Sequence, residues 1–207
     1  MNNSENKSAA HETLVLMLKL GIICIIVSGL LAVVNKITSP IISANDKKNF
    51  EQSMSEVLDC EKFEESKIDY TPSESGVELS SIYIGKDGDK TIGYVATAVC
   101  HEGYGGDVTV MVGINKSDGE KSKVKSVKIM SMSETAGLGA KANEPDFTNQ
   151  YSGLSEGIGV EKNNGGNAAN NTISAISGAT VTSKAVTKAV NCALGAADGL
   201  ENGGADK

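Results

Sequence analysis

The 207-residue sequence has no tryptophan and only three phenylalanines and three prolines, so aromatic side chains add little to its core. Its 23 glycines exceed the average share of roughly 7%. A domain of this composition depends on glycine turns and on packing of Val, Ile and Ala. Because domains cluster near roughly 100–150 residues, the length allows one ordinary domain with additional segments.

The four cysteines lack the short paired spacings of a zinc or iron–sulfur site, so we expect no metal centre. They are Cys24, Cys60, Cys100 and Cys192. Spacing alone leaves a disulfide open, although free, small core residues are the default expectation for Cys100 and Cys192. His101 has no second histidine or nucleophile near it, and we interpret it as a surface residue.

The chain also lacks a basic stripe. Asp and Glu number 26 against 19 Lys and Arg, which gives a formal net charge of -7, and the lysines are scattered. We therefore do not expect this protein to bind nucleic acid.

One long hydrophobic run extends from Leu14 to Val34 and is interrupted only by Lys19, Ser28 and two glycines. A bilayer-spanning helix needs roughly 20 such residues, whereas the apolar part of a signal peptide has about 7–15. We predict a polar N-terminus over 1–12 and an uncleaved transmembrane anchor over 13–35. Lysines lie on both sides of the run, so the positive-inside rule does not set its orientation.

The segment 36–70 is predicted to be a stalk. Thr38-Ser39-Pro40 is a stop signal for the anchor helix. Residues 41–65 then have apolar positions at three-to-four spacing, which predicts an amphipathic helix: Ile42, Phe50, Met54, Val57 and Leu58.

Strand patterns begin at Val77. The runs 77–84 and 91–100 flank a Lys-Asp-Gly-Asp turn and predict a β-hairpin. Runs at 108–114 and 123–130 flank the turn-rich segment 115–120, which predicts an antiparallel meander of about four strands. Lysines alternate with Val and Ile in the last run, so one face of this sheet is expected to be exposed to solvent.

The rest of the chain has small-residue loops and short elements. We expect a loop over 133–142, a short helix over 145–151 and a polar loop over 162–171. A strand over 172–176 and a helix over 183–196 should follow. Gly195 and Gly199 mark the end of this last helix. The predicted domain covers 71–198, and a solvated polar tail covers 199–207.

The segment Ser177-Gly178-Ala179-Thr180 joins that last strand to that last helix, and Thr182 and Ser183 follow. A helix N-terminus offers unpaired amide donors and the positive end of the helix dipole, so this junction suits an anion such as phosphate. The simpler interpretation is that Thr182 or Ser183 only caps the helix. Spacing alone leaves both interpretations open.

This segment resembles the flavinylation site of the FMN-binding domain in the G subunit of the Rnf electron-transport complex. The same domain occurs in the C subunit of the sodium-translocating NADH:quinone reductase. The resemblance implies that FMN is attached covalently, by a phosphoester to Thr180, and that a separate flavin transferase installs it from FAD. A threonine hydroxyl is a poor nucleophile without a base, and no His, Asp or Glu is adjacent.

Two further segments resemble the same family in the same order. His101-Glu102-Gly103-Tyr104-Gly105-Gly106 precedes a Val-Met-Val-Gly-Ile strand, and residues 133–141 (SETAGLGAK) are similar to a loop that lies along the flavin. Ala136 replaces the family's usual proline, and Met132 replaces a common histidine, so no role of that histidine transfers to this chain.

The resemblance covers nearly the whole chain and implies an α+β fold: a single N-terminal transmembrane helix followed by one FMN-binding domain with an antiparallel sheet and flanking helices. Glycines 137 and 139 would let the backbone approach the flavin closely, and Glu134 and Thr135 would hydrogen-bond it. The implied cofactor-binding residues are Thr180, Ser177, Gly178, Ala179, Thr182, Ser183, Glu134, Thr135, Gly137 and Leu138. No catalytic residue is implied.

The implied function is electron relay within an ion-translocating ferredoxin:NAD oxidoreductase complex in the cell membrane, with the FMN domain on the extracytoplasmic side. The implied partners are the other subunits of the complex and the transferase, and no enzymatic activity is expected of this chain alone. Two alternatives stay open within the family: a component of the sodium-translocating NADH:quinone reductase like its C subunit, or a stand-alone extracytoplasmic electron carrier. A third, of another class, is a membrane-tethered binding domain without redox function.

Overall fold

The computed structural model describes residues 3–67, 70–116, 121–162 and 165–201, with the backbone only for 3–13. The chain divides into two units, Met1–Phe50 and Glu51–Lys207.

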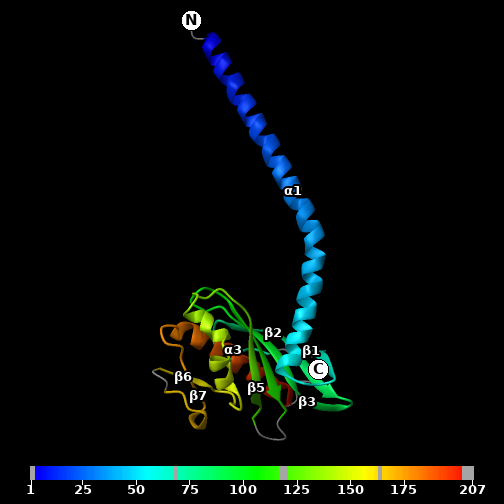
Figure 1. Cartoon of the computed structure of the whole chain (residues 1–207), viewed down its shortest axis with the longest axis vertical. Coiled ribbons are helices and arrows are strands. Elements are labelled where there is room, and N and C mark those ends of the chain that lie inside the picture. Colours follow the sequence, from blue (N-terminus) through cyan, green and yellow to red (C-terminus); the bar gives the residue numbers. More distant parts are fainter. Residues whose placement is uncertain (1–2, 68–69, 117–120, 163–164, 202–207) are drawn as a thin grey trace. The chain divides into compact units, whose positions relative to one another are not determined.

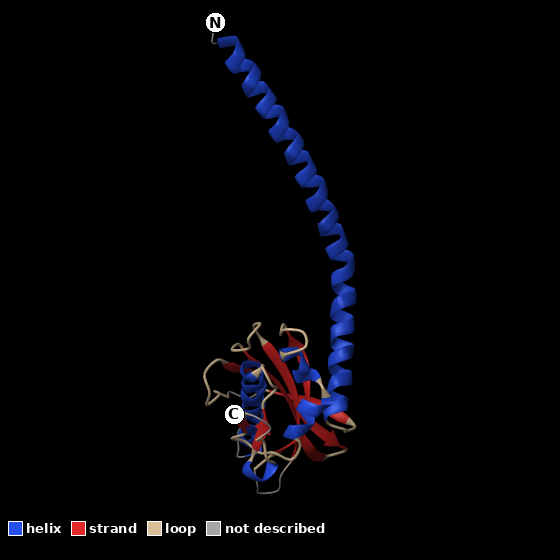
Figure 2. Cartoon of the chain, turned by 60° about the vertical axis from the view of Figure 1, so that its left-hand side comes forward, coloured by secondary structure: helices blue, strands red, loops and turns tan. Residues whose placement is uncertain are grey.

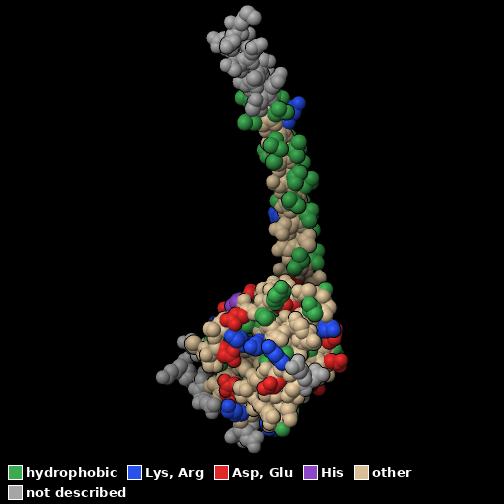
Figure 3. All heavy atoms as spheres, turned by 90° about the vertical axis from the view of Figure 1, so that its left-hand side faces the viewer, with side chains coloured by type: hydrophobic (Ala, Val, Ile, Leu, Met, Phe, Trp, Pro, Cys, Tyr) green, Lys and Arg blue, Asp and Glu red, His purple; other side chains and the backbone are tan. Residues whose placement is uncertain are grey.

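Helix α1 (Asn3–Val57) forms the described part of the first unit and the start of the second. Its most apolar stretch has a mean hydropathy of 2.7, and the residues of that stretch are exposed within the described part of the chain. Figure 3 shows hydrophobic side chains along this helix. The helix is long and apolar enough to cross a membrane, and it contains the anchor predicted over 13–35.

The helix begins at Asn3, within the polar N-terminus predicted over 1–12. It continues through Pro40, where we predicted its end, so that prediction is wrong. Proline removes one amide donor from a helix, and hydroxyls beside it supply other bonds to the backbone: Thr38 Oγ1 donates to the Val34 carbonyl at 2.8 Å, and Ser43 Oγ donates to that of Ser39 at 3.0 Å.

The predicted stalk helix ends at Val57 rather than near residue 65. The last apolar residue at helical spacing is Leu58, so nothing beyond it favours a buried helical face. The chain instead forms strand β1 (Lys62–Ser66), which pairs antiparallel with β2 from Lys62 opposite Lys86 to Ser66 opposite Ile82.

The second unit is built on one antiparallel sheet in the order β1-β2-β3-β4-β5 (Figure 1). The predicted meander is confirmed and gains β1 as a fifth strand. Its other strands are β2 (Val77–Asp87), β3 (Lys90–Cys100), β4 (Val108–Asn115) and β5 (Lys123–Met132). Of the turn predicted over 115–120, residues 117–120 lie outside the described residues.

Short elements connect β5 to the last helix. The helix predicted over 145–151 is confirmed as α2 followed by η2, whereas β6, which pairs in parallel with β7, was not predicted. The elements are η1 (Gly139–Asn143), α2 (Pro145–Thr148), η2 (Asn149–Tyr151), β6 (Gly159–Glu161), η3 (Ala168–Asn170), β7 (Thr172–Ser174) and α3 (Thr180–Gly199). The predicted polar loop contains η3, and its residues 163–164 lie outside the description.

Helix α3 begins three residues earlier than predicted and does not end at Gly195. A Cβ atom at Gly195 would overlap the Tyr70 hydroxyl, so glycine is required there by close packing rather than by a helix end. Leu200 is 5% exposed and belongs to the core. The predicted solvated tail is therefore wrong at Leu200, and its residues 202–207 lie outside the description.

Both faces of the central strands are buried. Helix α3 covers one face, where it packs on inward-pointing residues such as Ala96 and Val112 (Figure 2). The alternate residues Val95 and Met111 point to the opposite face and are also 0% exposed. Met54 and Val57, at the end of α1, are buried as well. The expectation of a solvent-exposed face is therefore wrong for β3 and β4, although Lys123 and Lys125 of β5 are exposed.

A glycine in β4 allows the end of α1 to pack closely on the sheet. A Cβ atom at Gly113 in β4 would overlap the backbone carbonyl of Val57. The Ser126 hydroxyl donates to the same carbonyl at 2.9 Å, and Lys128 pairs with Glu56 nearby. The end of α1 thus rests directly on the sheet backbone.

Replacing Gly113 by alanine should destabilise the second unit, because the added methyl group forces the α1 end away from the sheet. Overpacking of this kind costs about 1–3 kcal/mol, and each kcal/mol lowers Tm by about 2–4 °C in a domain of this size. Thermal unfolding of the full chain in detergent measures the shift. Lys128→Gln is the control: it removes an exposed ion pair at the same contact and should barely change Tm. Equal melting of Gly113→Ala and the wild type would contradict the packing argument.

Candidate functional site

The junction between β7 and α3 is a tight turn. The Ala179 amide donates to the Ile176 carbonyl at 2.9 Å, and Gly178 has φ of 78°. A side chain at that φ would be strained, which explains glycine there. Helix α3 then begins at Thr180, with Ala179 as its N-cap residue.

Ser183 holds this turn in place by two hydrogen bonds. Its hydroxyl accepts from the Ile176 amide at 3.0 Å and donates to the Ala179 carbonyl at 2.9 Å, and the residue is 0% exposed. The N-cap residue Ala179 has no side-chain acceptor for the first-turn amides. The prediction that Thr182 or Ser183 caps the helix is therefore wrong. The first amides of α3 stay available to an anion.

Glu134 joins three segments at this end of the sheet. Its Oε2 accepts from the Thr182 hydroxyl at 2.9 Å, and its Oε1 accepts from the Gly105 amide at 3.2 Å. The loop after β5 is thereby connected to the first turn of α3 and to the β3–β4 turn. Gly139 allows the close approach, because a Cβ atom there would come within 2.7 Å of both Glu134 Oε2 and Thr182 Oγ1.

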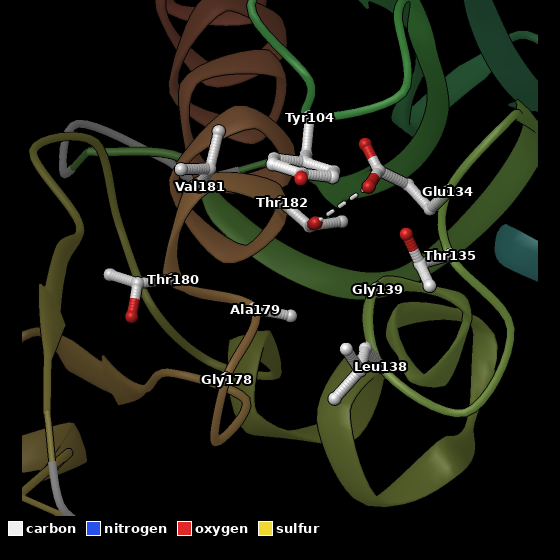
Figure 4. A pocket seen from close by; sticks show the side chains of 10 residues that line it. All are labelled: Tyr104, Glu134, Thr135, Leu138, Gly139, Gly178, Ala179, Thr180, Val181 and Thr182. Atoms are coloured by element: carbon white, nitrogen blue, oxygen red, sulfur yellow. Dashed lines mark hydrogen bonds between the residues drawn. The ribbon is translucent and has the colours of Figure 1, made fainter.

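These segments enclose a pocket of about 450 Å³ (Figure 4). Thr182 points toward Glu134, whereas Thr180 lies at the edge, apart from Glu134 and Thr135. The lining residues are Tyr104, Glu134, Thr135, Leu138, Gly139, Gly178, Ala179, Thr180, Val181 and Thr182. The volume is in the range typical of small-molecule and cofactor sites, roughly 300–1,000 Å³.

The pocket rim is apolar. Within the second unit, the large hydrophobic side chains that are exposed among the described residues are Tyr104 (74%), Leu138 (44%) and Val181 (49%). All three line this pocket. Exposed apolar side chains gathered at one cavity are typical of ligand-binding sites.

The structure brings together most of the residues that the sequence predicted. Ser177 lies instead in a neighbouring hollow of about 220 Å³. Gly137 and Ser183 do not line the pocket. In the lining are Thr180, Gly178, Ala179, Thr182, Glu134, Thr135 and Leu138.

Sequence reasoning missed Tyr104 and Val181 as pocket residues. Tyr104 was noted only as part of a glycine-rich turn, and an exposed aromatic in such a turn is the signal that could have identified it. Val181 is an apolar residue on the polar side of α3, and its 49% exposure is the corresponding signal.

Cys100 and Cys192 are buried and free, as expected, and Cys60 is also free. Burial raises the pKa of the Cys192 thiol to about 12, so it is a poor nucleophile. No group of three or more His, Cys, Asp or Glu side chains that could hold a metal ion occurs in the described ranges.

His101 is exposed, as predicted, and closes the turn that contains Tyr104. Its Nδ1 lies 2.9 Å from Asp107 Oδ1, and its Nε2 lies 3.7 Å from Glu78 Oε1. The hydrogen bond to Asp107, and then the charges of both carboxylates, raise the pKa of His101.

The chain is similar to several known proteins. The FMN-binding domain family matches residues 103–195. The G subunit of the Na(+)-translocating ferredoxin:NAD(+) oxidoreductase complex of Acetobacterium woodii is 32% identical over 204 residues, which cover 92% of this chain and 96% of that protein. The G subunit of the proton-translocating complex of Clostridium ljungdahlii is 36% identical over 180 residues, covering 84% and 86%. The crystal structure of Shewanella oneidensis NqrC aligns with a TM-score of 0.49 at 17% identity, covering 60% of this chain and 62% of that one.

Asp107→Asn should lower the pKa of His101 toward its ordinary value, because the first cause of the upward shift is the bond to that carboxylate. The imidazole of the wild type should therefore stay protonated to a higher pH than that of the variant. An NMR titration of the His101 ring protons in the full chain measures this. Glu78→Gln removes the more distant carboxylate and should lower the pKa less. An unchanged pKa in Asp107→Asn would contradict the assigned cause.

Proposed function

The chain belongs to the family formed by the G subunits of ion-translocating ferredoxin:NAD(+) oxidoreductase (Rnf) complexes, and we propose that it holds FMN covalently on Thr180 and relays electrons in such a complex. Family membership and the FMN-binding domain support a membrane flavoprotein of an electron-transport complex. The attachment and its residue are our proposal. The two relatives are named for different ions, so the proposal specifies no coupling ion.

The state of the two threonines favours Thr180 as the acceptor. Its side chain is partly exposed at the pocket edge, and its hydroxyl makes no hydrogen bond within the described residues. Thr182 is 1% exposed and donates its hydroxyl proton to Glu134. A separate transferase can reach the first hydroxyl but not the second. This difference is the observation on which the proposal depends.

The residues fit FMN on three counts. The uncapped first turn of α3 offers amide donors to a phosphate that is esterified to Thr180. The apolar rim formed by Tyr104, Leu138 and Val181 suits a flat ring system. The cavity between them extends from Thr180 to Glu134.

Each part of the chain then has a physical role. Bound FMN supplies the redox chemistry, and the protein supplies binding, orientation and electrostatics. Thr180 is a tether rather than a participant in turnover. Gly178 permits the turn that exposes it, Ser183 holds that turn, and Glu134 fixes the opposite wall. We also propose that Thr135 contacts the flavin or its ribityl chain and that Gly137 lets the loop backbone approach it.

Thr180→Ala should abolish covalent flavin in full-length protein that is co-expressed with an FAD-dependent flavin transferase. Thr180→Ser keeps a hydroxyl and should retain flavin. Thr182→Ala should also retain it, because the Thr182 hydroxyl is buried. Fluorescence of the denatured protein in a gel reports covalent flavin, and mass spectrometry of peptides locates it. Flavin found on Thr182 would refute the acceptor assignment. If the wild-type chain carries no covalent flavin on any residue, the alternative of a binding domain without redox function is favoured.

We further propose one membrane crossing within the most apolar part of α1, with the domain over 71–198 on the extracytoplasmic side. The long exposed apolar helix supports the crossing, and the side follows from the family resemblance alone. Alkaline phosphatase fused after Lys207 in a bacterial host should be active, because this enzyme forms its disulfides only outside the cytoplasm. The same enzyme fused before Met1 should be inactive. The reverse pattern would place the domain in the cytoplasm.

A further inference from the structure

Glu134 is the one charged residue among the ten that line the pocket. The others are threonines, glycines, Ala179, Leu138, Val181 and Tyr104. Its side chain is partly buried, so bulk water screens its charge less than at the surface. A ligand in this cavity therefore experiences one formal negative charge from the pocket wall.

No Lys, Arg or His side chain forms an ion pair with Glu134 in the described part of the chain. Lys188, on the same helix as Thr182, pairs with Glu102 at 2.9 Å and with Glu74 at 3.8 Å. The partners of Glu134 are an amide and a hydroxyl, which orient the carboxylate without cancelling its charge. The carboxylate is thus fixed in position and, among the described residues, has no ion-pair partner.

We propose, on the basis of the function proposed above, that Glu134 lowers the midpoint potential of the bound flavin. Transfer of two electrons and one proton to a neutral isoalloxazine leaves one net negative charge on the ring. A fixed carboxylate on the same pocket wall repels that charge and does not repel the neutral oxidised ring. The oxidised form is therefore favoured, and the flavin becomes a stronger reductant.

Glu134→Gln tests the charge with little change in shape. Glutamine has the same length; its amide oxygen can accept from the Gly105 amide while its NH2 group donates to the Thr182 hydroxyl oxygen. The loop, the turn and the helix should stay joined, so the variant is expected to fold and to accept flavin. Glu134→Asp is the complementary variant, because it keeps the negative charge and shortens the side chain.

A third variant controls for net charge. Asp89 lies in the turn between β2 and β3, at the end of β3 away from the pocket. Eleven strand residues at about 3.3 Å each place it about 35 Å from the Cys100 end of that strand. That distance exceeds the Debye length of about 8 Å at physiological salt. Asp89→Asn therefore removes one carboxylate without affecting the pocket.

The experiment is a redox titration of the full chain in detergent, loaded by the flavin transferase. Dithionite supplies the electrons, water supplies the protons, and flavin absorbance reports the ratio of reduced to oxidised flavin. Glu134→Gln should raise that ratio at least tenfold at a fixed potential, which corresponds to about 30 mV for a two-electron couple. Glu134→Asp and Asp89→Asn should stay near the wild type.

An unchanged potential in flavin-loaded Glu134→Gln would overturn the inference. Equal rises in the Gln and Asp variants would also overturn it, because hydrogen-bond geometry rather than charge would then set the potential. A matching rise in Asp89→Asn would assign the effect to net charge and overturn it as well. Each of these results leaves covalent FMN on Thr180 intact. A wild-type chain without covalent flavin would instead defeat the proposed function.

Discussion

Burial of both faces of strands β3 and β4 is the constraint on which the second unit depends. Helix α3 covers one face, and the end of α1 covers the other at the level of Gly113. The two strands are therefore fixed on both sides, and the turn that joins Cys100 to Val108 extends from their buried ends. The pocket is built at this end of the sheet, where the rigid core holds one wall and the start of α3 holds the other.

Within the pocket, few polar bonds organise a largely apolar cavity. Ser183 holds the turn before α3 by hydrogen bonds, and Glu134 connects the first turn of α3 to two loops. The hydroxyl of Thr182 is occupied by that network, whereas the hydroxyl of Thr180 is not. Two threonines that are two residues apart thus differ in what they can do, because one side chain faces the network and the other faces the edge.

The sequence predicted features that depend on local patterns. The alternation of apolar residues predicted β2 to β5, and the order of strand, glycine and hydroxyls predicted the turn that precedes α3. Features that depend on tertiary contacts were not predicted. β1 exists through its pairing with β2, Gly195 lies mid-helix because Tyr70 packs against it, and Leu200 is buried by the core. Spacing alone also could not separate Thr180 from Thr182, since their difference lies in burial.

The charged edges of the sheet have a consequence for a protein held in the plane of a membrane. β1, at one edge, has the ion pairs of Glu64 with Lys62 and Lys86, and β5, at the other, is bridged at Lys123 by Ser155 and has the exposed Lys125. Unpaired strand edges can add strands from neighbouring molecules, and charged edge residues oppose this. Membrane-anchored copies meet at high local concentration, so these charges favour separate, folded domains over aggregation.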